Sequence, residues 1–470
     1  MSGPGDPLLL FSILIFSGLA LSILTFELVL RRVDIFDPVV LFTAFYALFV
    51  LPLPIRAYIT DRVEGNITPY LNNLYPFLSL AVLLSALGLL VLVVVYHSPI
   101  VPVLAGRIPL PPPSSPRGSS CAFWFLIFLS GFLIALLSYS VGGLDVLLSK
   151  GYEASAELFG RGYLAIGFPW GFVASLFLLL HYALKPRLRY LLGFGILFAL
   201  MVFIQLIMGN RSLILTATLA TLIFVHYAIR KFRSWEFLTL AAMAFLGLNL
   251  YGFLRSSDYE GIGGFLTKTH EQFVQLLESN ELSKSLFYTV TIGEFVVPFE
   301  TLPQMIRTVG GEINPLWGLS FVRAPLYYIP SAIFSERPLP LANWYMQEFY
   351  GTEFGLNEGR QFFILAEGYL NFGVAGVFVV MVIWGIFLGL LREFKARARG
   401  EPGALLLYSV TLAFIFRAVA GDFASLVVGL PSQNLFPALL GVLIATRFRR
   451  WRRVRKRELA SLHPKGGEAS

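Results

Sequence analysis

Residues 374–399 read VAGVFVVMVIWGIFLGLLREFKARAR, an apolar run that ends in a basic cluster. A helix rises ~1.5 Å per residue, so this run, extended by the apolar residues before it, can cross the ~30 Å of bilayer hydrocarbon. It is too long and too uniformly apolar for a strand of a membrane barrel, which alternates over ~10 residues. The stretch therefore predicts a transmembrane helix whose basic end faces the cytoplasm.

The same pattern recurs along the whole chain. Its 470 residues are 56% hydrophobic and only 14% charged, whereas soluble domains are roughly a quarter charged. This composition excludes a set of soluble domains and predicts an all-α polytopic membrane protein. We expect about eleven transmembrane helices, at residues 8–30, 38–54, 75–96, 121–140, 164–184, 190–208, 212–229, 236–254, 362–391, 403–420 and 425–446.

The basic residues predict how the chain is oriented. Each odd-numbered span exits into a basic segment, which places those segments and the C-terminus in the cytoplasm and the N-terminus outside. The first run lacks the basic start of a cleaved signal peptide. We expect four regions: an N-terminal bundle of about eight spans (1–254), a long external, periplasmic loop (255–361), C-terminal transmembrane helices (362–446) and a basic cytoplasmic tail (447–470).

The tail and the long loop each suggest a partner. Nine of the 36 Lys and Arg residues lie in the tail, and because it follows an apolar helix, anionic lipid is a better partner for it than nucleic acid. The loop of roughly a hundred residues keeps many apolar stretches. Such a length without function is unusual, so we expect short helices on the outer interface, suited to a lipid-linked substrate.

Charged residues within or beside the spans are candidate functional residues. Arg211 stands in a tight junction between two apolar runs, either as an interfacial anchor or as a ligand for an anionic group such as phosphate. Glu367 lies early in the ninth span and shares a helix face with Asn371. It is either a structural acid paired with Arg360 or a functional one.

The remaining polar residues indicate which kinds of site the chain can form. Arg417 and Asp422 lie near the outer end of the tenth span and can pair with each other. His270 is the one histidine of the external loops, and Cys121 is the single cysteine. These predict no metal site and no other cofactor. Neither a nucleotide-binding fingerprint nor a nucleophile elbow is present.

Several short segments resemble one known family. The segment GNRSLIL (209–215) resembles the glycine–arginine junction between central spans of bacterial O-antigen and oligosaccharide repeat-unit polymerases of the Wzy type. The segment YIPSAIFSERP (328–338) is similar to that family's proline-flanked stretch, and FILAEGYLNFGVAG (363–376) to its Glu/Tyr/Asn-Phe-Gly helix start. The loop beginning at Gly142 also fits, so the resemblance covers roughly residues 140–380.

The resemblance implies a metal-independent membrane glycosyltransferase of the GT-C type in the bacterial inner membrane. Donor and acceptor would be undecaprenyl-diphosphate-linked oligosaccharides, and a chain-length regulator would be a protein partner. Fixed cations can stabilise the leaving diphosphate, and the acceptor hydroxyl needs a base, with Glu367 first and His270 second. The residues expected to bind diphosphate or sugar are Arg211, Arg255, Arg323, Arg360, Arg417, Asn371 and Tyr369.

The sequence does not decide the role of four aromatic residues, and it leaves two alternative functions. Tyr327, Tyr328, Trp344 and Tyr345 are either sugar-stacking residues or interfacial anchors. The first rival is an O-antigen ligase, which uses the same donor. The second is a flippase or other transporter of lipid-linked sugars, although transporters more often show internal repeats and midspan charges.

Overall fold

The fold is given by a computed structural model of the chain. The structure describes residues 6–31, 34–61, 63, 74–143, 146–147, 162–233, 235–236, 239–240, 264, 267, 270–271, 274, 297–329, 333–334, 336–351 and 361–447.

Helices make up the regular structure of these residues, apart from one isolated bridge between Val309 and Ile313. Within the described ranges, ten helices are long and apolar enough to cross a membrane. They are α1 (Pro7–Thr25) with the π-helical η1 (Phe26–Leu30), α2 (Pro38–Val50) with α3 (Pro52–Thr60), α4 (Tyr75–Tyr96), α6 (Pro116–Ser140), α9 (Gly162–Ala165) with α10 (Gly167–Leu184), α11 (Leu188–Ile207), α12 (Arg211–Ala228), α19 (Ile364–Ala398), α20 (Pro402–Ala413) with α21 (Ile415–Ala420), and Ser425–Arg447, which begins with the π-helical η5 (Ser425–Leu435).

These helices confirm the all-α membrane fold and ten of the predicted spans. The predicted eighth span, 236–254, falls almost wholly outside the described residues. The second span is longer than predicted, because the chain continues as a helix through Pro52 to Thr60. Pro431 lies inside the last span, where the wider π-helical backbone of η5 accommodates it.

Polar caps explain where several of these helices begin. Side chains of Asp6, Asp37, Ser115, Asn210 and Glu401 each accept a hydrogen bond from a backbone N–H of the first turn, at 2.9–3.2 Å. Such caps satisfy donors that have no partner within the helix. A proline follows the cap in α1, α2, α6 and α20, where its missing N–H leaves no hydrogen bond unmade.

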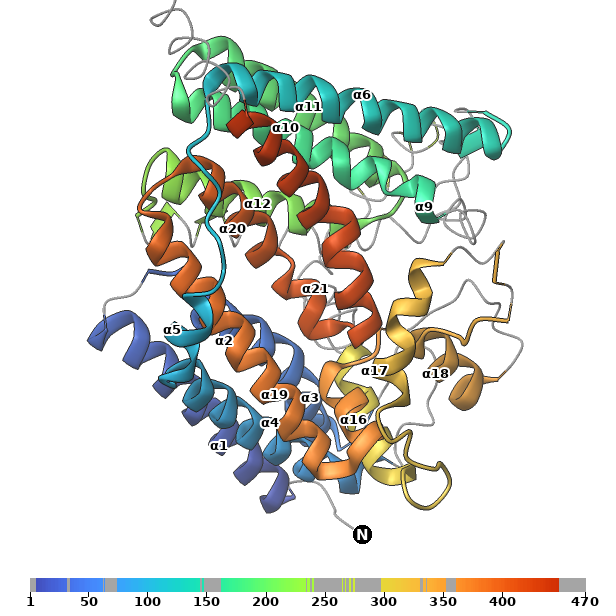
Figure 1. Ribbon diagram of the computed structural model, residues 1–470. Coiled ribbons are helices and arrows are strands. Elements are labelled where there is room, and N and C mark those ends of the chain that lie inside the picture. The colour runs from blue at the N-terminus through green and yellow to red at the C-terminus, as the bar shows by residue number, and fades with distance from the viewer. Residues whose placement is uncertain are drawn as a thin grey trace, which may run out of the picture.

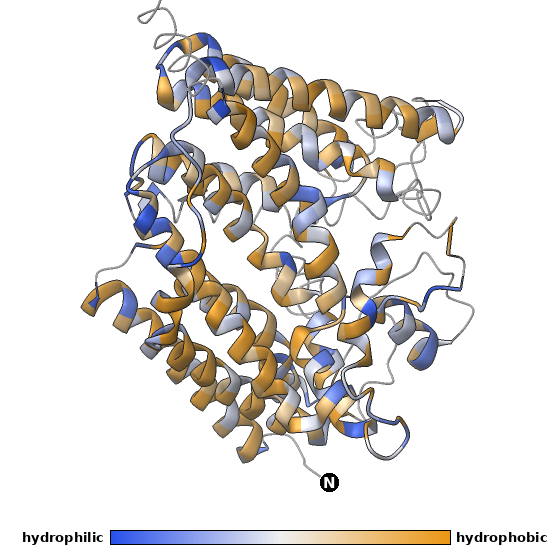
Figure 2. Ribbon diagram, viewed as in Figure 1, coloured by the Kyte–Doolittle hydropathy of each residue, from blue (hydrophilic) through white to orange (hydrophobic). Residues whose placement is uncertain are grey.

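The spanning helices form two groups with a third between them. In Figure 1, α1, α2, α4 and α19 pack together, as do α6, α10 and α11, while α12, α20 and α21 lie between these groups. Figure 2 shows apolar residues along the helices and hydrophilic residues gathered at their ends. Small residues allow close packing: a Cβ on Gly385 of α19 would lie 2.7 Å from the carbonyl oxygen of Leu92 in α4.

The connections after the first, third and ninth spans lie together at one end of the bundle, as the charge pattern predicts. Arg31, after the first span, lies 2.6 Å from His97, after the third, and Arg392 near the end of α19 lies 3.3 Å from the same ring. Ser114, before α6, donates its N–H to Glu401, between α19 and α20. We call this the basic end.

The long segment between α12 and α19 contains the short helices that we predicted. They are α16 (Val297–Thr308), α17 (Leu319–Arg323), the 3-10 helix η4 (Ala324–Tyr328) and α18 (Leu341–Tyr350). Helix α16 buries Phe299, Leu302 and Met305 completely and packs against α4 and α19. The described helices of this segment therefore pack on the bundle at the end opposite the basic one, with α16 and α17 against α19.

Candidate functional site

A break in α19 shapes the site. Phe372 and Gly373 have non-helical backbone angles, and Gly373 has a φ of +57°, a conformation that glycine adopts without strain. Residues eight apart in a straight helix are ~12 Å apart, yet a Cβ on Gly368 would lie 2.6 Å from the carbonyl oxygen of Gly376. The first two turns of α19 therefore fold back on the rest, and they carry Glu367 and Asn371.

Glu367 is buried and is held by two neutral donors. The Ser320 hydroxyl donates to its Oε1 and the backbone N–H of Phe423 to its Oε2, both at 2.5 Å. Its side chain is 1% exposed. The sequence also allowed a structural ion pair between Glu367 and Arg360, but Arg360 lies outside the described residues. Among the described residues, no cation contacts the Glu367 carboxylate.

Asn371 holds the loop before α17 against the broken helix. Its Oδ1 accepts the N–H of Gly318 at 2.9 Å, and its Nδ2 donates to the Ser320 hydroxyl at 2.7 Å and to the carbonyl of Glu367 at 2.8 Å. The amide is fully buried, and both its donors are used within the protein. The prediction that Asn371 lies beside Glu367 is therefore confirmed, in a place where it orients Ser320.

A cleft opens beside these groups. Its empty space is about 350 Å³, which includes part of the surrounding solvent. Two acids, one cation and two hydroxyl groups line it, and apolar side chains close its walls. The lining residues are Leu316, Ser320, Arg323, Tyr327, Pro338, Leu339, Leu341, Glu367, Asp422 and Ala424. We call it the acidic cleft.

Asp422 caps the last spanning helix and also faces the acidic cleft. Its Oδ1 accepts the N–H and the hydroxyl of Ser425, at 2.8 and 2.5 Å, which is the pattern of an N-cap. Its Oδ2 accepts no hydrogen bond from any residue that the structure describes. Because Glu367 binds the N–H of Phe423, both acids lie at one helix N-terminus, whose partial positive charge favours carboxylates.

Arg323 and Tyr327 complete the polar lining. Arg323 is exposed, and within the described part of the chain it forms no ion pair, so its donors are open to the cleft. The Tyr327 hydroxyl donates to the carbonyl of Leu339 at 2.8 Å. Burial and the nearby Asp422 raise the pKa of Tyr327 to about 12, against the opposing charges of Arg337 and Arg323. Tyr327 therefore stays protonated at neutral pH and cannot be the base.

The other predicted site residues lie outside the acidic cleft. Arg211 is at the start of α12, where Asn210 caps the helix, and Tyr369 lies on another side of the first turns of α19. His270 is exposed and does not line the cleft. Arg255 and Arg360 lie outside the described residues. In the described segments, no three His, Cys, Asp or Glu side chains are grouped as a metal site would require.

Two interpretations of the sequence are wrong. Arg417 does not pair with Asp422: its Nη1 donates to Oε1 of Gln433 at 2.5 Å, while Asp422 binds Ser425. The two residues flank the turn at Gly421, which points their side chains to different partners. Tyr345 is neither a sugar platform nor an interfacial anchor, because it is 1% exposed and packs against Phe349 and Phe362.

Comparison with known proteins gives one family. The family model described as O-antigen polysaccharide polymerase Wzy matches residues 8–450, nearly the whole chain and all of the residues around the cleft. No curated protein and no solved structure matches the chain.

Proposed function

This chain belongs to the O-antigen polysaccharide polymerase Wzy family, and we propose that it joins polyprenyl-diphosphate-linked oligosaccharide repeat units at the acidic cleft. One observation carries the proposal. Glu367 and Asp422 line the same cleft, and neither has a described cation as a partner, although Arg323 lines that cleft too. Burying a carboxylate without a cationic partner destabilises the folded protein, so acids of this kind are candidates for binding a ligand.

The reaction replaces one bond to the donor's anomeric carbon by another. The bond from this carbon to the diphosphate oxygen breaks, and a bond to an acceptor sugar hydroxyl forms. The hydroxyl proton passes to a carboxylate of the enzyme, and polyprenyl diphosphate leaves with the electron pair of the broken bond. A cleft with carboxylates inside suits a neutral sugar better than an anionic diphosphate, so we place the acceptor sugar here.

Asp422 is our candidate for the group that takes the proton. Its Oδ2 is the carboxylate oxygen of the pair with no described hydrogen bond, whereas each oxygen of Glu367 already accepts one. Glu367 keeps one lone-pair position on each oxygen. It can therefore accept a hydrogen bond from the same sugar and hold the reacting hydroxyl near Asp422. The pair shares the role for which the sequence analysis named Glu367 first and His270 second.

Arginines serve the leaving group in this proposal. A diphosphate accepts paired hydrogen bonds from the planar fork of a guanidinium, and fixed cations lower the barrier without a metal. Arg323 lines the acidic cleft, and Arg211 and Arg417 lie on spanning helices of the same bundle. Because basic connections favour the cytoplasmic side, we propose that the basic end faces the cytoplasm of a bacterium and that the cleft lies at the outer face of the inner membrane.

Polymerisation by purified protein tests the proposal. With a lipid-linked repeat unit as substrate, we expect Glu367→Gln and Asp422→Asn each to slow chain growth by about 10²-fold or more, the scale of general base catalysis. Glu312→Gln is the matched control, because Glu312 is an exposed acid of the same long segment. Near-normal chain growth in both cleft variants would refute the proposal.

A further inference from the structure

We infer that a second cleft, between α10, α12, α20 and η5, holds the isoprenoid chain of the polyprenyl diphosphate, with its diphosphate on Arg417. This inference rests on the proposed function, because it assigns a place to the lipid that the reaction uses. We call the second cleft the apolar cleft. It is separate from the acidic cleft and shares no lining residue with it.

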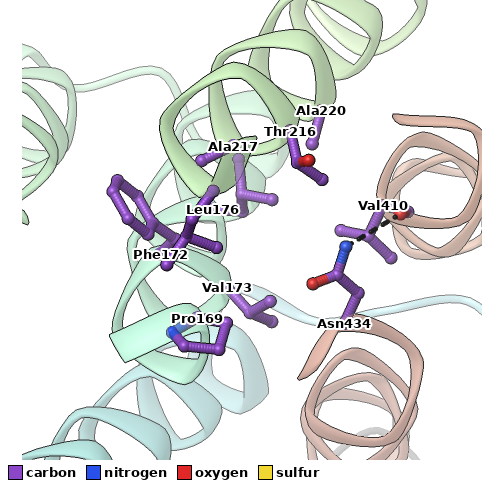
Figure 3. Close-up of a pocket in the computed structure, with 10 residues that line it drawn as sticks. Pro169, Phe172, Val173, Leu176, Thr216, Ala217, Ala220, Val410 and Asn434 are labelled. Atoms are coloured by element: carbon purple, nitrogen blue, oxygen red, sulfur yellow. Dashed lines mark hydrogen bonds between the residues drawn. The ribbon is translucent and has the colours of Figure 1, made fainter. Parts of the chain in front are cut away.

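The lining of the apolar cleft suits a hydrocarbon chain. Four residues of α10 and four of α12 form one side, and Val410 and Asn434 form the other, as Figure 3 shows. No lining side chain is charged, and Phe172 and Ala217 are among the lining residues. The empty space, about 290 Å³ including part of the open surroundings, lies between spanning helices. A water-soluble ligand would find few hydrogen-bond partners there.

The backbone on one side of the apolar cleft is irregular. Helix η5 is π-helical over Ser425–Leu435 and contains Pro431. Irregular backbone at membrane depth is tolerated where it is buried in protein or lines a cavity, and π-helical turns are frequent at functional sites. Trp170 of α10 fixes this segment by donating its indole N–H to the carbonyl of Ser432 at 2.8 Å.

A cation lies next to this irregular segment. The Nη1 of Arg417 donates to the side chain of Gln433, the residue before Asn434, and its guanidinium stands 5.3 Å from the Phe414 ring centroid. Both partners are neutral, and among the described residues Arg417 forms no ion pair. Most of its five N–H donors therefore remain for an anion. Through Gln433, this half-buried guanidinium is joined to the segment whose Asn434 lines the apolar cleft, and a cation in that position matches a molecule with an anionic head and a hydrocarbon tail.

The position of Arg417 also links the two clefts. Helix α21 ends at Ala420, and Asp422, which lines the acidic cleft, follows after Gly421. A diphosphate on Arg417 would thus lie five residues along the chain from the carboxylate that we assign as the base. The lipid approaches from between the helices, while the acceptor sugar enters beside α17 and η4.

Photo-crosslinking of a lipid without any sugar tests this inference separately from the transfer reaction. Benzoylphenylalanine replaces Phe172 in the apolar cleft or, as control, Phe128, which is 74% exposed on α6. The purified protein is reconstituted in anionic phospholipid, and the probe is radiolabelled polyprenyl diphosphate. We expect strong labelling at position 172, competed by unlabelled polyprenyl diphosphate, and only weak labelling at position 128. Adding Arg417→Gln should weaken binding about tenfold or more, since hydrogen bonds to a charged group are lost.

Each other outcome has one meaning. Equal labelling at the two positions, in protein that still polymerises, overturns the inference and leaves the proposed function standing. Labelling at position 172 that only phospholipid competes away shows an ordinary lipid site and also overturns it. Labelling that Arg417→Gln does not change overturns the assignment of the diphosphate. Ala217→Trp, which fills the cleft, should abolish labelling, whereas Ile196→Trp on the exposed face of α11 should not.

Discussion

The acids at the two ends of the bundle have different surroundings. At the basic end, Glu27 lies 2.7 Å from His97 and 3.8 Å from Arg31, although it is 1% exposed. Asp34 accepts the Tyr227 hydroxyl at 2.5 Å, and Lys395 donates to the same hydroxyl. In the acidic cleft, Glu367 and Asp422 are about as deeply buried as Glu27 but bind only hydroxyls and backbone N–H groups.

This difference distinguishes acids that stabilise the fold from acids that are available to bind a ligand. Burial acts to raise the pKa of Asp34, but its contacts with His226 and Tyr227 and the charge of Lys395 lower it to about 2. Asp34 is thus fixed as an anion by its neighbours. The cleft acids have hydrogen-bonding capacity left and a space beside it. A buried charge whose neighbours do not neutralise it is a candidate for function.

The largest expected effect is on chain growth. The double variant Glu367→Gln/Asp422→Asn should lose about as much activity as the more damaged single variant, at least about 10²-fold, because residues that act on one step are not additive. Polymerisation rates of the two single variants and the double variant check this. A double variant whose loss equals the product of the single losses would mean that the two acids act independently.

The corresponding change at the basic end should affect stability instead. Glu27→Ala removes the hydrogen-bond partner of His97 and the ion-pair partner of Arg31, and the loss of these contacts should destabilise the protein by roughly 1–3 kcal/mol. We expect a lower melting temperature in detergent with an unchanged rate per folded molecule. A normal melting temperature combined with a slow rate would reverse the distinction between the two ends.

A smaller effect is expected from the residue that positions Ser320. Asn371→Ala removes its hydrogen bonds to Ser320 and to the N–H of Gly318. Because Ser320 then loses one of its two described contacts, we expect about a tenfold slower rate, roughly the worth of one hydrogen bond. Kinetics at varied acceptor concentration check this, and an unchanged rate would show that Ser320 needs no such support.

The smallest effect is the pH dependence of stability at the basic end. Burial, with the charges of Arg31 and Arg392, lowers the pKa of His97, although Glu27 opposes them. The folded state then binds fewer protons than the unfolded chain, so stability is full above about pH 6.5 and falls below it. The slope cannot exceed about 1.4 kcal/mol per pH unit for one proton. Melting temperatures from about pH 7.5 to 5 should show this slope, and His97→Gln should remove it.

Much of the fold was predictable because local patterns of apolar and charged residues along the sequence determine it. Apolar runs predicted ten of the spans, and basic residues predicted which connections meet at one end. The face shared by Glu367 and Asn371 follows from helical spacing alone. These features depend on residues close together in sequence, where periodicity and charge give a direct signal.

The rest of the site depends on contacts between distant segments. Ser320 lies 47 residues before Glu367, and its position depends on the break at Phe372-Gly373. Asp422 did carry a signal, as an acid just before an apolar run, but that pattern also fits an ordinary helix cap. Tyr345 looked like an interfacial aromatic because its burial under the long segment leaves no mark in the sequence.

A comparison of two aspartates with the same exposure tests most directly whether the acids of the acidic cleft act in catalysis. Asp37 and Asp422 are each 3% exposed, and each accepts a backbone N–H of the helix that follows it. Asp37 also accepts the Tyr96 hydroxyl at 2.6 Å, whereas Asp422 lines the acidic cleft. The measurement is the polymerisation rate per folded molecule of Asp37→Asn and Asp422→Asn, with their melting temperatures. We expect the rate to fall by about 10²-fold or more for Asp422→Asn and to stay near normal for Asp37→Asn. Equal rates in the two variants, at similar melting temperatures, would contradict it.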